Sequence, residues 1–405
     1  MRVLLINNFH YIKGGSEAVY FNMARMFTQA GHDVLFFSCT SDRNLEYGAN
    51  EHFVAPNSEV NPVVGAMRYI YNGSAACALD KLLTEHRVDI AHIHLFWGGL
   101  SSSILGVLKR HKVPVVHTAH DYRMICPAYT LRRPDGTICD SCYGGNYLHC
   151  IAHKCSKNSL LRSCLMSGEF FFRNWFIRPL KAIDGLVFVS RFSYEQHLKA
   201  LPALAQKQTL VAHNAIDFLP ESAISQQMGS YYLYFGRLSH EKGLVTLIEA
   251  FNALSDLRLK IVGEGPMESS LREIASANIE FCGYQSGDAL RQTIRQCKAI
   301  VVPSEWYENN PMTIIEASMA GIPTIGARIG GIPEIIVEGK TGYIFTSKSV
   351  SELTEAVTKL EALSAEQYQA MSLECRKFAD EKFSSRALYE KIIKFYTSIL
   401  ESYES

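Results

Sequence analysis

The stretch PSEWYENNPMTIIEASMAGIP, residues 303–323, carries the strongest indication of how this chain folds. A Pro-Ser pair ends the apolar run 299–302, which predicts a strand, and a polar turn follows. A helix begins readily at Pro311, because a residue in the first turn needs no backbone N–H donor. Apolar residues then recur at helical spacing from Met312 to Met319, and Gly321 ends the helix. The stretch therefore predicts a strand, a loop and a short helix.

Two carboxylates flank the expected start of this helix. Glu308 precedes it and Glu316 lies inside it. The backbone N–H groups of Asn309, Asn310 and Met312 should point out of a positive helix end, which suits a phosphate. Carboxylates on either side could accept hydrogen bonds from sugar hydroxyls, so the order of groups matches a nucleoside diphosphate sugar. The alternative is an ordinary α/β turn with two solvated glutamates.

Length and composition indicate a folded protein of two domains. The chain has 405 residues, 47% hydrophobic and 20% charged, with a formal net charge of zero. That length exceeds one ordinary core, and the neutral balance implies no general attraction to nucleic acid. The apolar runs are shorter than a membrane-spanning helix, and the start MRVLLINNF is too short and polar for a signal peptide. We therefore expect a cytoplasmic protein.

Strand-like and helix-like segments alternate along the first half. Residues 2–8 form an apolar run, followed by Gly14-Gly15 and a helix that Ser16 could cap. Further buried strands are predicted at residues 34–38, 89–94, 113–118 and 185–189. This alternation predicts an α/β fold with a mostly parallel, doubly wound sheet. The glycine pair lacks the full G-x-G-x-x-G pattern, so nicotinamide binding has little support.

His120 and Asp121 directly follow the predicted strand 113–118. Ligands of such sheets bind beyond the carboxyl ends of the strands, so His120 is a candidate functional residue at that edge. A structural histidine is the alternative.

Six cysteines interrupt the regular pattern between Met124 and Cys164. Four of them, in the spacing C-x2-C-x7-C-x4-C, could enclose a structural zinc ion: Cys139, Cys142, Cys150 and Cys155. Cys126, His149 and His153 could substitute as ligands. Unliganded thiols in a flexible loop are the alternative, and a catalytic metal is less favoured.

The segment 154–191 is basic and aromatic. Phe170, Phe171, Phe172, Trp175 and Phe176 crowd one predicted helix, and basic residues outnumber acidic ones. Such a helix can lie on an anionic membrane surface. The alternative is core packing with arginines reaching outward.

The second half repeats the strand–loop–helix alternation after a polar segment, 222–229, that resembles a linker. Arg237 and Lys242 lie in a glycine-bounded turn after the predicted strand 231–235, where two cations could reach a diphosphate. Further strands are expected at 258–262, before Gly263, and at 279–283. Gly330-Gly331 makes another turn at the same edge, and the final helix, about 385–400, is amphipathic.

Several of these segments together resemble glycosyltransferase family 4, whose members are retaining enzymes of the GT-B fold. The matching pieces are GRLSHEKGL (236–244), VGEGP (262–266), the pair Glu308 and Glu316, GGIPEII (330–336) and GKTGYIF (339–345). KGGSEAVYF (13–21) and HDYRMICP (120–127) extend the resemblance to the first half.

The resemblance implies two Rossmann-like domains whose parallel sheets face a central cleft. An acceptor domain would span residues 1–220, with a cysteine-rich insertion at about 124–164. A donor domain would span 221–382, and a helix at 383–405 would return to the first domain. No cofactor is implied for catalysis, and the chain contains no D-x-D pair for a donor-bound metal.

The resemblance also assigns roles to residues. Arg237 and Lys242 would hold the donor diphosphate, Glu308 the sugar hydroxyls, Glu316 the ribose, and His120 would lie near the transferred sugar. The other donor-binding positions are Gly15, Gly236, Gly263, Asn309, Asn310, Pro311 and Met312. Family members usually follow the first acid with Pro-Phe-Gly, so Asn309-Asn310-Pro311 here is a candidate cause of an altered sugar preference.

The implied function is retaining transfer of a sugar from a nucleoside diphosphate sugar to a glycan or lipid-linked acceptor. The expected setting is cell-surface polysaccharide synthesis at the inner face of the membrane. Two alternatives remain: a sugar-nucleotide epimerase of the same architecture, and a non-catalytic subunit that binds glycan or nucleotide sugar. Donor consumption with and without acceptor would separate the three.

Overall fold

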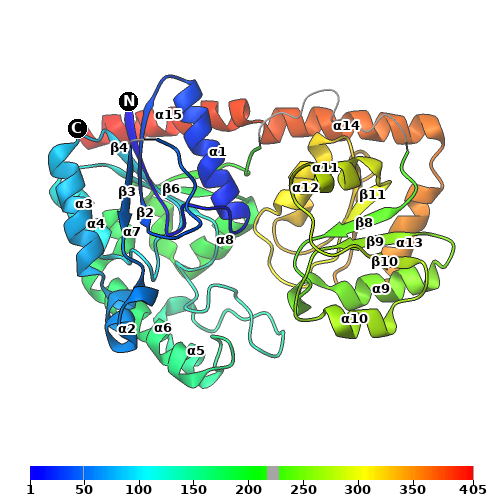
Figure 1. The fold of residues 1–405 in the computed structure, drawn as a ribbon, viewed down its shortest axis with the longest axis horizontal. Helices are drawn as coiled ribbons and strands as arrows, with labels where there is room; N and C mark the ends of the chain where they lie inside the picture. Colours follow the sequence, from blue (N-terminus) through cyan, green and yellow to red (C-terminus); the bar gives the residue numbers. More distant parts are fainter. Residues whose placement is uncertain (49, 217–227, 405) are drawn as a thin grey trace. The chain divides into compact units, whose positions relative to one another are not determined.

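The computed structural model describes residues 1–48, 50–216 and 228–404, which form two compact units (Figure 1). The first unit contains Met1–His213 together with the chain from Leu388 onward, and the second contains Asn214–Ala387. The sequence-based boundaries, 220 and 382, lie a few residues away from these limits. Most of the expected linker at 222–229 lies outside the described residues.

The first unit is built on a parallel sheet. Its strands run in the order β3-β2-β1-β4-β5-β6-β7. Their bounds are β1 (Arg2–Ile6), β2 (Asp33–Cys39), β3 (Glu51–Val54), β4 (Ile90–Ile93), β5 (Val115–Ala119), β6 (Gly185–Phe188) and β7 (Gln208–Val211). Chain order reverses between β1 and β4, which pair in register with Val3 opposite Ile90. In doubly wound sheets, ligands bind beside the strand ends at this switch point.

Helices connect the strands of the first unit: α1 (Gly15–Gln29), α2 (Pro62–Ile70), α3 (Gly73–Glu85), α4 (Ser103–Arg110), α5 (Leu148–Ala152), α6 (Leu160–Phe172), α7 (Pro179–Ala182) and α8 (Arg191–Ala200). Polar side chains fix several starts, as where Asn72 accepts a hydrogen bond from the Ala75 backbone N–H at 3.1 Å. A π-helical turn, η3 (Arg173–Ile177), extends α6. No described helix combines the length and apolar character needed to span a bilayer.

The second unit repeats the arrangement, with strand order β10-β9-β8-β11-β12-β13, all parallel. The strands are β8 (Tyr232–Phe235), β9 (Leu259–Val262), β10 (Ile279–Phe281), β11 (Ala299–Val302), β12 (Thr324–Ala327) and β13 (Gly342–Phe345). Successive side chains of β8 enter opposite cores: Tyr232 and Tyr234 pack on one face, Leu233 and Phe235 on the other. A run buried on both faces explains why β8 reads as continuously apolar.

Helices cover both faces of this sheet (Figure 1). They are α9 (Leu244–Ala253), α10 (Glu268–Ile274), α11 (Gly287–Gln296), α12 (Met312–Met319), α13 (Val350–Glu361) and α14 (Ala365–Phe383). Helix α12 begins one residue later than expected, because Pro311 keeps an extended backbone with ψ of 120° and serves as the N-cap.

The last helix, α15 (Ser385–Glu404), contributes to the first unit from Leu388 onward. Tyr396 packs against Phe27 with ring centroids 5.5 Å apart, and its hydroxyl lies 2.5 Å from Nδ1 of His92 in β4. The hydroxyl oxygen of Tyr389 lies 2.9 Å from Nε2 of His32. The apolar face of this amphipathic helix therefore completes the core of the first unit.

Candidate active site

Lys242 and Glu308 meet at the switch point of the second sheet. Lys242 ends the 3₁₀ turn η6 (His240–Lys242) after β8, and Glu308 lies in the loop after the neighbouring strand β11. Lys242 Nζ lies 2.6 Å from Glu308 Oε1. The fold thus joins two predicted site residues that stand 66 positions apart in the sequence.

The surroundings of Glu308 keep its carboxylate ionised. The side chain is buried, and Ser304 donates a hydrogen bond to Oε1 at 2.9 Å. Burial alone would raise the pKa of Glu308, but the Lys242 ammonium and the hydrogen bonds outweigh it and hold the pKa below its ordinary value. Glu308 is therefore a pre-oriented acceptor of hydrogen bonds.

Arg237 offers a second positive charge in the same loop. Its side chain is exposed, and within the described part of the chain its guanidinium has no hydrogen bond or ion pair. Its backbone carbonyl accepts a hydrogen bond from the Tyr234 hydroxyl at 2.8 Å. The loop position is thus held while the guanidinium stays available for an anion.

Glycines allow these loops to pack directly on one another. A Cβ at Gly243, where φ is +69°, would lie 1.9 Å from the carbonyl oxygen of Pro303 in the loop after β11. A Cβ at Gly263 would lie equally close to the carbonyl oxygen of Gly236. Loop packing alone accounts for glycine at position 263, which was predicted to bind donor.

Gly243→Ala should lower the free energy of unfolding by about 3 kcal/mol or more, because a clash adds to the cost of a left-handed backbone. Gly283→Ala is the matched control: its φ is also +69°, but no atom lies within 4 Å of the added Cβ. We expect the control to lose only about 1–2 kcal/mol in urea denaturation. Equal losses of unfolding free energy in the two variants would show that the close approach to Pro303 does not contribute to the effect.

The Asn309–Met312 segment carries structural contacts as well. Asn310 is buried, and its side-chain oxygen accepts a hydrogen bond from the backbone N–H of Asn214 at 2.7 Å. The Glu308 carbonyl accepts one from the N–H of Gly331 at 2.7 Å, which ties in the predicted glycine turn. The donor-binding roles of this segment and of Pro311 remain predictions.

Glu316 lies in α12 and is half-buried. Burial raises its pKa to about 7, and Arg291 opposes this only in part. The side chain therefore changes charge within the physiological pH range.

The stability of the protein should fall as pH rises from 4.5 toward 8, because the folded state binds the Glu316 proton more tightly than the unfolded state. The shift corresponds to at most about 3 kcal/mol. Glu316→Gln should remove this part of the pH dependence in urea denaturation series, whereas Glu374→Gln, on an exposed helical face, should leave it unchanged. An identical pH profile for Glu316→Gln and wild type would contradict the assignment.

In the first unit, His120 belongs to a row of histidines at the ends of β4 and β5. Its Nε2 lies 2.8 Å from Nδ1 of His94, and the two rings stack with centroids 5.1 Å apart. Burial lowers the pKa of His120 to about 3, so its imidazole is neutral at pH 7. A neutral ring can exchange hydrogen bonds with a ligand but supplies no positive charge. Gly15, the other predicted residue of this unit, is the first residue of α1.

Sequence reasoning missed two features of the first unit. His94 was not singled out, although the repeat IAHIH places His92 and His94 on one face of a strand. A cavity of about 650 Å³ was also missed. Its wall contains the carboxylates of Asp42 and Glu59 together with three cationic and four aromatic residues: Lys13, Arg43, Arg123, Phe9, Tyr11, Tyr69 and Trp97. Burial lowers the pKa of Lys13, and the charges of Arg123 and Arg43 act in the same direction.

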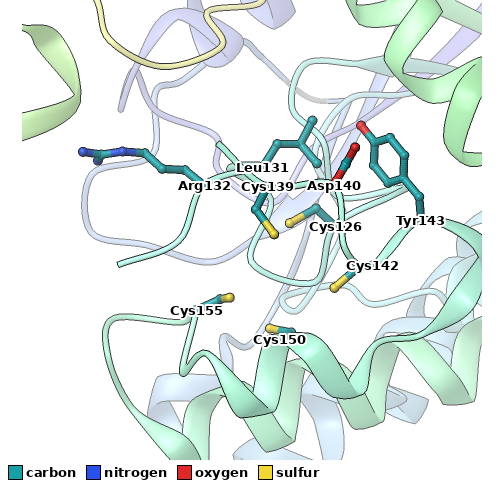
Figure 2. Close-up of a pocket in the computed structure, with 9 residues that line it drawn as sticks. All are labelled: Cys126, Leu131, Arg132, Cys139, Asp140, Cys142, Tyr143, Cys150 and Cys155. Atoms are coloured by element: carbon teal, nitrogen blue, oxygen red, sulfur yellow. The ribbon is translucent and has the colours of Figure 1, made fainter. Parts of the chain in front are cut away.

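The cysteine-rich segment gathers five thiols around a small cavity (Figure 2). Cys126, Cys139, Cys142, Cys150 and Cys155 all line it, whereas His149 and His153 do not. Cys126, expected only as a substitute, is therefore part of the cluster. Among the residues that the structure describes, no three His, Cys, Asp or Glu side chains are already arranged to coordinate a metal ion.

The basic aromatic segment divides between core and surface. Phe170 and Arg173 are buried, with the Arg173 guanidinium 4.0 Å from the ring of Trp97, so this arginine does not reach outward. Other apolar side chains of the segment are exposed, and α6 packs against α2, which also exposes apolar side chains. We define the α2–α6 surface by Val63, Met67, Leu161, Trp175 and Phe176, the last three being 81%, 78% and 70% exposed.

Family comparisons agree with this architecture. Residues 13–218 match the family model described as Glycosyltransferase Family 4, and residues 215–378 match the model described as Glycosyl transferases group 1.

Two individual proteins illustrate the sequence similarity. An uncharacterized 42.6 kDa protein in the cps region of Klebsiella pneumoniae is 24% identical over 83% of this chain and 87% of that protein. The sulfoquinovosyl transferase SQD2 of Arabidopsis thaliana is 35% identical over 32% of this chain, which spans only 26% of that protein.

Solved structures share the fold. Sucrose-phosphate synthase from Thermosynechococcus elongatus superposes with a TM-score of 0.71 at 17% identity, covering 99% of both chains. Anabaena HepE in complex with UDP and glucose gives 0.65 at 16% identity, covering 98% of this chain and 99% of that one.

Proposed function

Because this chain belongs to glycosyltransferase family 4, we propose that it is a retaining enzyme that transfers a sugar from a nucleoside diphosphate sugar to a glycan or lipid-linked acceptor. The observation that carries the proposal is the Lys242–Glu308 pair beside the exposed Arg237, at the switch point between β8 and β11. There two cations can hold a diphosphate, while an ionised, oriented carboxylate accepts hydrogen bonds from a sugar.

The reaction needs stabilisation of the departing nucleotide. Cleavage of the anomeric bond leaves its electron pair on the terminal phosphate, so negative charge grows where Arg237 and Lys242 can reach it. In a front-face retaining mechanism the acceptor hydroxyl attacks from the side of the leaving phosphate and passes its proton to that phosphate. No second carboxylate nucleophile is then required, in contrast to retaining glycosidases.

The relatives support a choice of donor and of biological setting to test. A structural neighbour holds UDP and glucose, so UDP-glucose is the first donor to test. A relative from a cps region supports a role in cell-surface polysaccharide synthesis.

We propose further that the acceptor is anionic and enters the cavity of the first unit. Lys13, Arg43 and Arg123 outnumber Asp42 and Glu59 in the wall of a space of about 650 Å³, and an entering phosphate or carboxylate would relieve the repulsion among the three cations. Tyr69, which is half-buried in the same wall, offers an aromatic face for a sugar. A phosphate-linked saccharide combines both groups.

The α2–α6 surface fits a peripheral contact with an anionic leaflet. Trp175, Phe176 and Leu161 could enter the interfacial layer, and basic side chains of α2, α6 and the segment after η3 could meet lipid phosphates: Arg68, Arg162, Arg178 and Lys181. Such contact would hold the enzyme beside a lipid-linked acceptor at the inner face of a membrane.

The double variant Trp175→Glu and Leu161→Glu should reduce binding to vesicles that contain anionic lipid by at least about tenfold, because it removes apolar area and adds repulsion. Vesicle co-sedimentation measures this. Tyr284→Glu, a comparably exposed aromatic residue of the second unit, should bind as wild type does. Unchanged binding of the double variant would rule out the α2–α6 surface as the contact.

The decisive test of function is consumption of a panel of nucleotide sugars, followed by mass spectrometry, with and without a phosphate-linked saccharide acceptor. We expect one donor to be consumed rapidly only with acceptor, and a product one sugar larger that keeps the anomeric configuration. An epimerase would release nucleotide without acceptor, and a binding subunit would consume nothing. Either result would overturn the proposal.

A further inference from the structure

The five-cysteine cavity after β5 belongs to no part of the proposed sugar-transfer site. It lies in an irregular segment that contains only the short turn η2 (Tyr143–Gly145), the short helix α5 and an isolated bridge between Arg132 and Ile138. The cavity measures about 10 Å³, which is room for about one water-sized particle. A segment with so little regular structure needs some other source of rigidity.

The thiols differ in how they sit around this space (Figure 2). Cys126, Cys142 and Cys150 are buried. Cys155 lies close enough to all three for their charges to interact, and Cys142 interacts in the same way with Cys126, Cys150 and Cys139. Cys139 and Cys155 are both partly exposed, and Cys139 differs from Cys155 in its polar partners: its sulfur lies 3.3 Å from Ser141 Oγ and accepts a hydrogen bond from Arg133.

Backbone groups already point at one of these sulfurs. The N–H groups of Ala128, Thr130 and Leu131 are directed at the sulfur of Cys126. Donors of this kind orient a thiolate that binds a metal and reduce its charge.

Backbone strain is concentrated in the same segment. Of the non-glycine residues with positive φ in the described chain, five of nine lie here: Tyr129, Leu131, Lys154, Lys157 and Asn158. Such conformations persist only where surrounding contacts enforce them. Tyr129 and Leu131 follow Cys126, and Lys154 precedes Cys155, so the strained residues adjoin the thiols.

We propose that this cavity is a structural zinc site, with Cys126, Cys142, Cys150 and Cys155 as its tetrahedral thiolate ligands and Cys139 outside the ligand set. Four soft ligands around space for a single ion fit Zn²⁺, whereas an iron–sulfur cluster needs more room. Zinc binding would require the side chains to rotate until the sulfurs reach the Zn–S distance of about 2.3 Å. This ligand set replaces the one suggested by spacing alone, since Cys126 takes the place of Cys139.

The test is the metal content of the full chain, purified without chelators and without a histidine tag. We expect about one zinc per chain and negligible iron. After dialysis against a competing chelator, Cys126→Ser should hold at least about tenfold less zinc than wild type. Cys139→Ser should keep its zinc, as should Cys164→Ser, an exposed thiol near the same segment.

A second measurement uses the wild-type protein and therefore tests the proposal even if the variants fail to fold. A thiol-specific mercurial added to the wild-type protein should release the zinc as the thiolates react, followed with a metal-sensitive dye. Absence of zinc from the wild type, disulfides among these cysteines, or loss of zinc from Cys139→Ser but not from Cys126→Ser would each overturn the proposal. None of these outcomes depends on sugar transfer.

Discussion

Lys242→Ala should lower kcat/KM for sugar transfer by about three orders of magnitude. A cation about 4 Å from the departing phosphate contributes roughly 4 kcal/mol at an effective dielectric constant of 20, and each 1.36 kcal/mol is worth about tenfold in rate. Loss of the ammonium also leaves the buried carboxylate of Glu308 without its partner at 2.6 Å. Steady-state kinetics with the identified donor would measure the effect.

Stability must be measured beside activity, because the substitution breaks a largely buried ion pair. The double variant Lys242→Met and Glu308→Gln removes both charges and should unfold at a higher urea concentration than Lys242→Ala, while remaining inactive. Lys260→Ala, which breaks a more exposed pair with Glu280, should retain full activity. Turnover close to wild type in Lys242→Ala would exclude the proposed role.

Arg237→Ala should reduce transfer by a similar factor of about a thousand, but without loss of stability. The guanidinium is exposed and has no partner among the described residues, so its removal breaks no contact within the protein. Donor kinetics and urea denaturation together separate the two effects. Arg237→Lys should retain more activity than Arg237→Ala, since lysine keeps the positive charge but cannot form the bidentate hydrogen bonds of a guanidinium.

The control for Arg237 is Arg272→Ala, which removes an arginine that pairs with Glu268 on the surface of α10. Its activity should be unchanged. If Arg237→Ala kept normal kinetics, or if it unfolded more easily than wild type, the residue would be structural rather than a contact to the donor diphosphate.

Some strands could be read from the sequence and others could not. The strand at Ala299–Val302 was predicted to the residue, because a strand buried on both faces gives an unbroken apolar run. β3 was missed: its sequence EHFV is partly exposed at the edge of the sheet and shows no such run. β12 and β13 were also missed, since runs of only four residues, TIGA and GYIF, carry little periodicity.

The candidate site also has features that could be predicted from the sequence and features that could not. Loop positions after strands were predictable, since chain order in a parallel sheet places every loop of one kind at the same edge. Side-chain partners were not. The sequence indicates that Lys242 and Glu308 lie near the same edge, but not that they form an ion pair, nor that Ser304 shares the carboxylate.

The sequence alone determined the family, the alternation of strands and helices, and which loops carry charge, because these depend on local order along the chain. Only the tertiary structure decided which distant residues meet: Lys242 with Glu308, His94 with His120, and Cys126 with the other thiols. Contacts between residues far apart in sequence depend on strand order and side-chain packing, and neither leaves a local pattern in the chain.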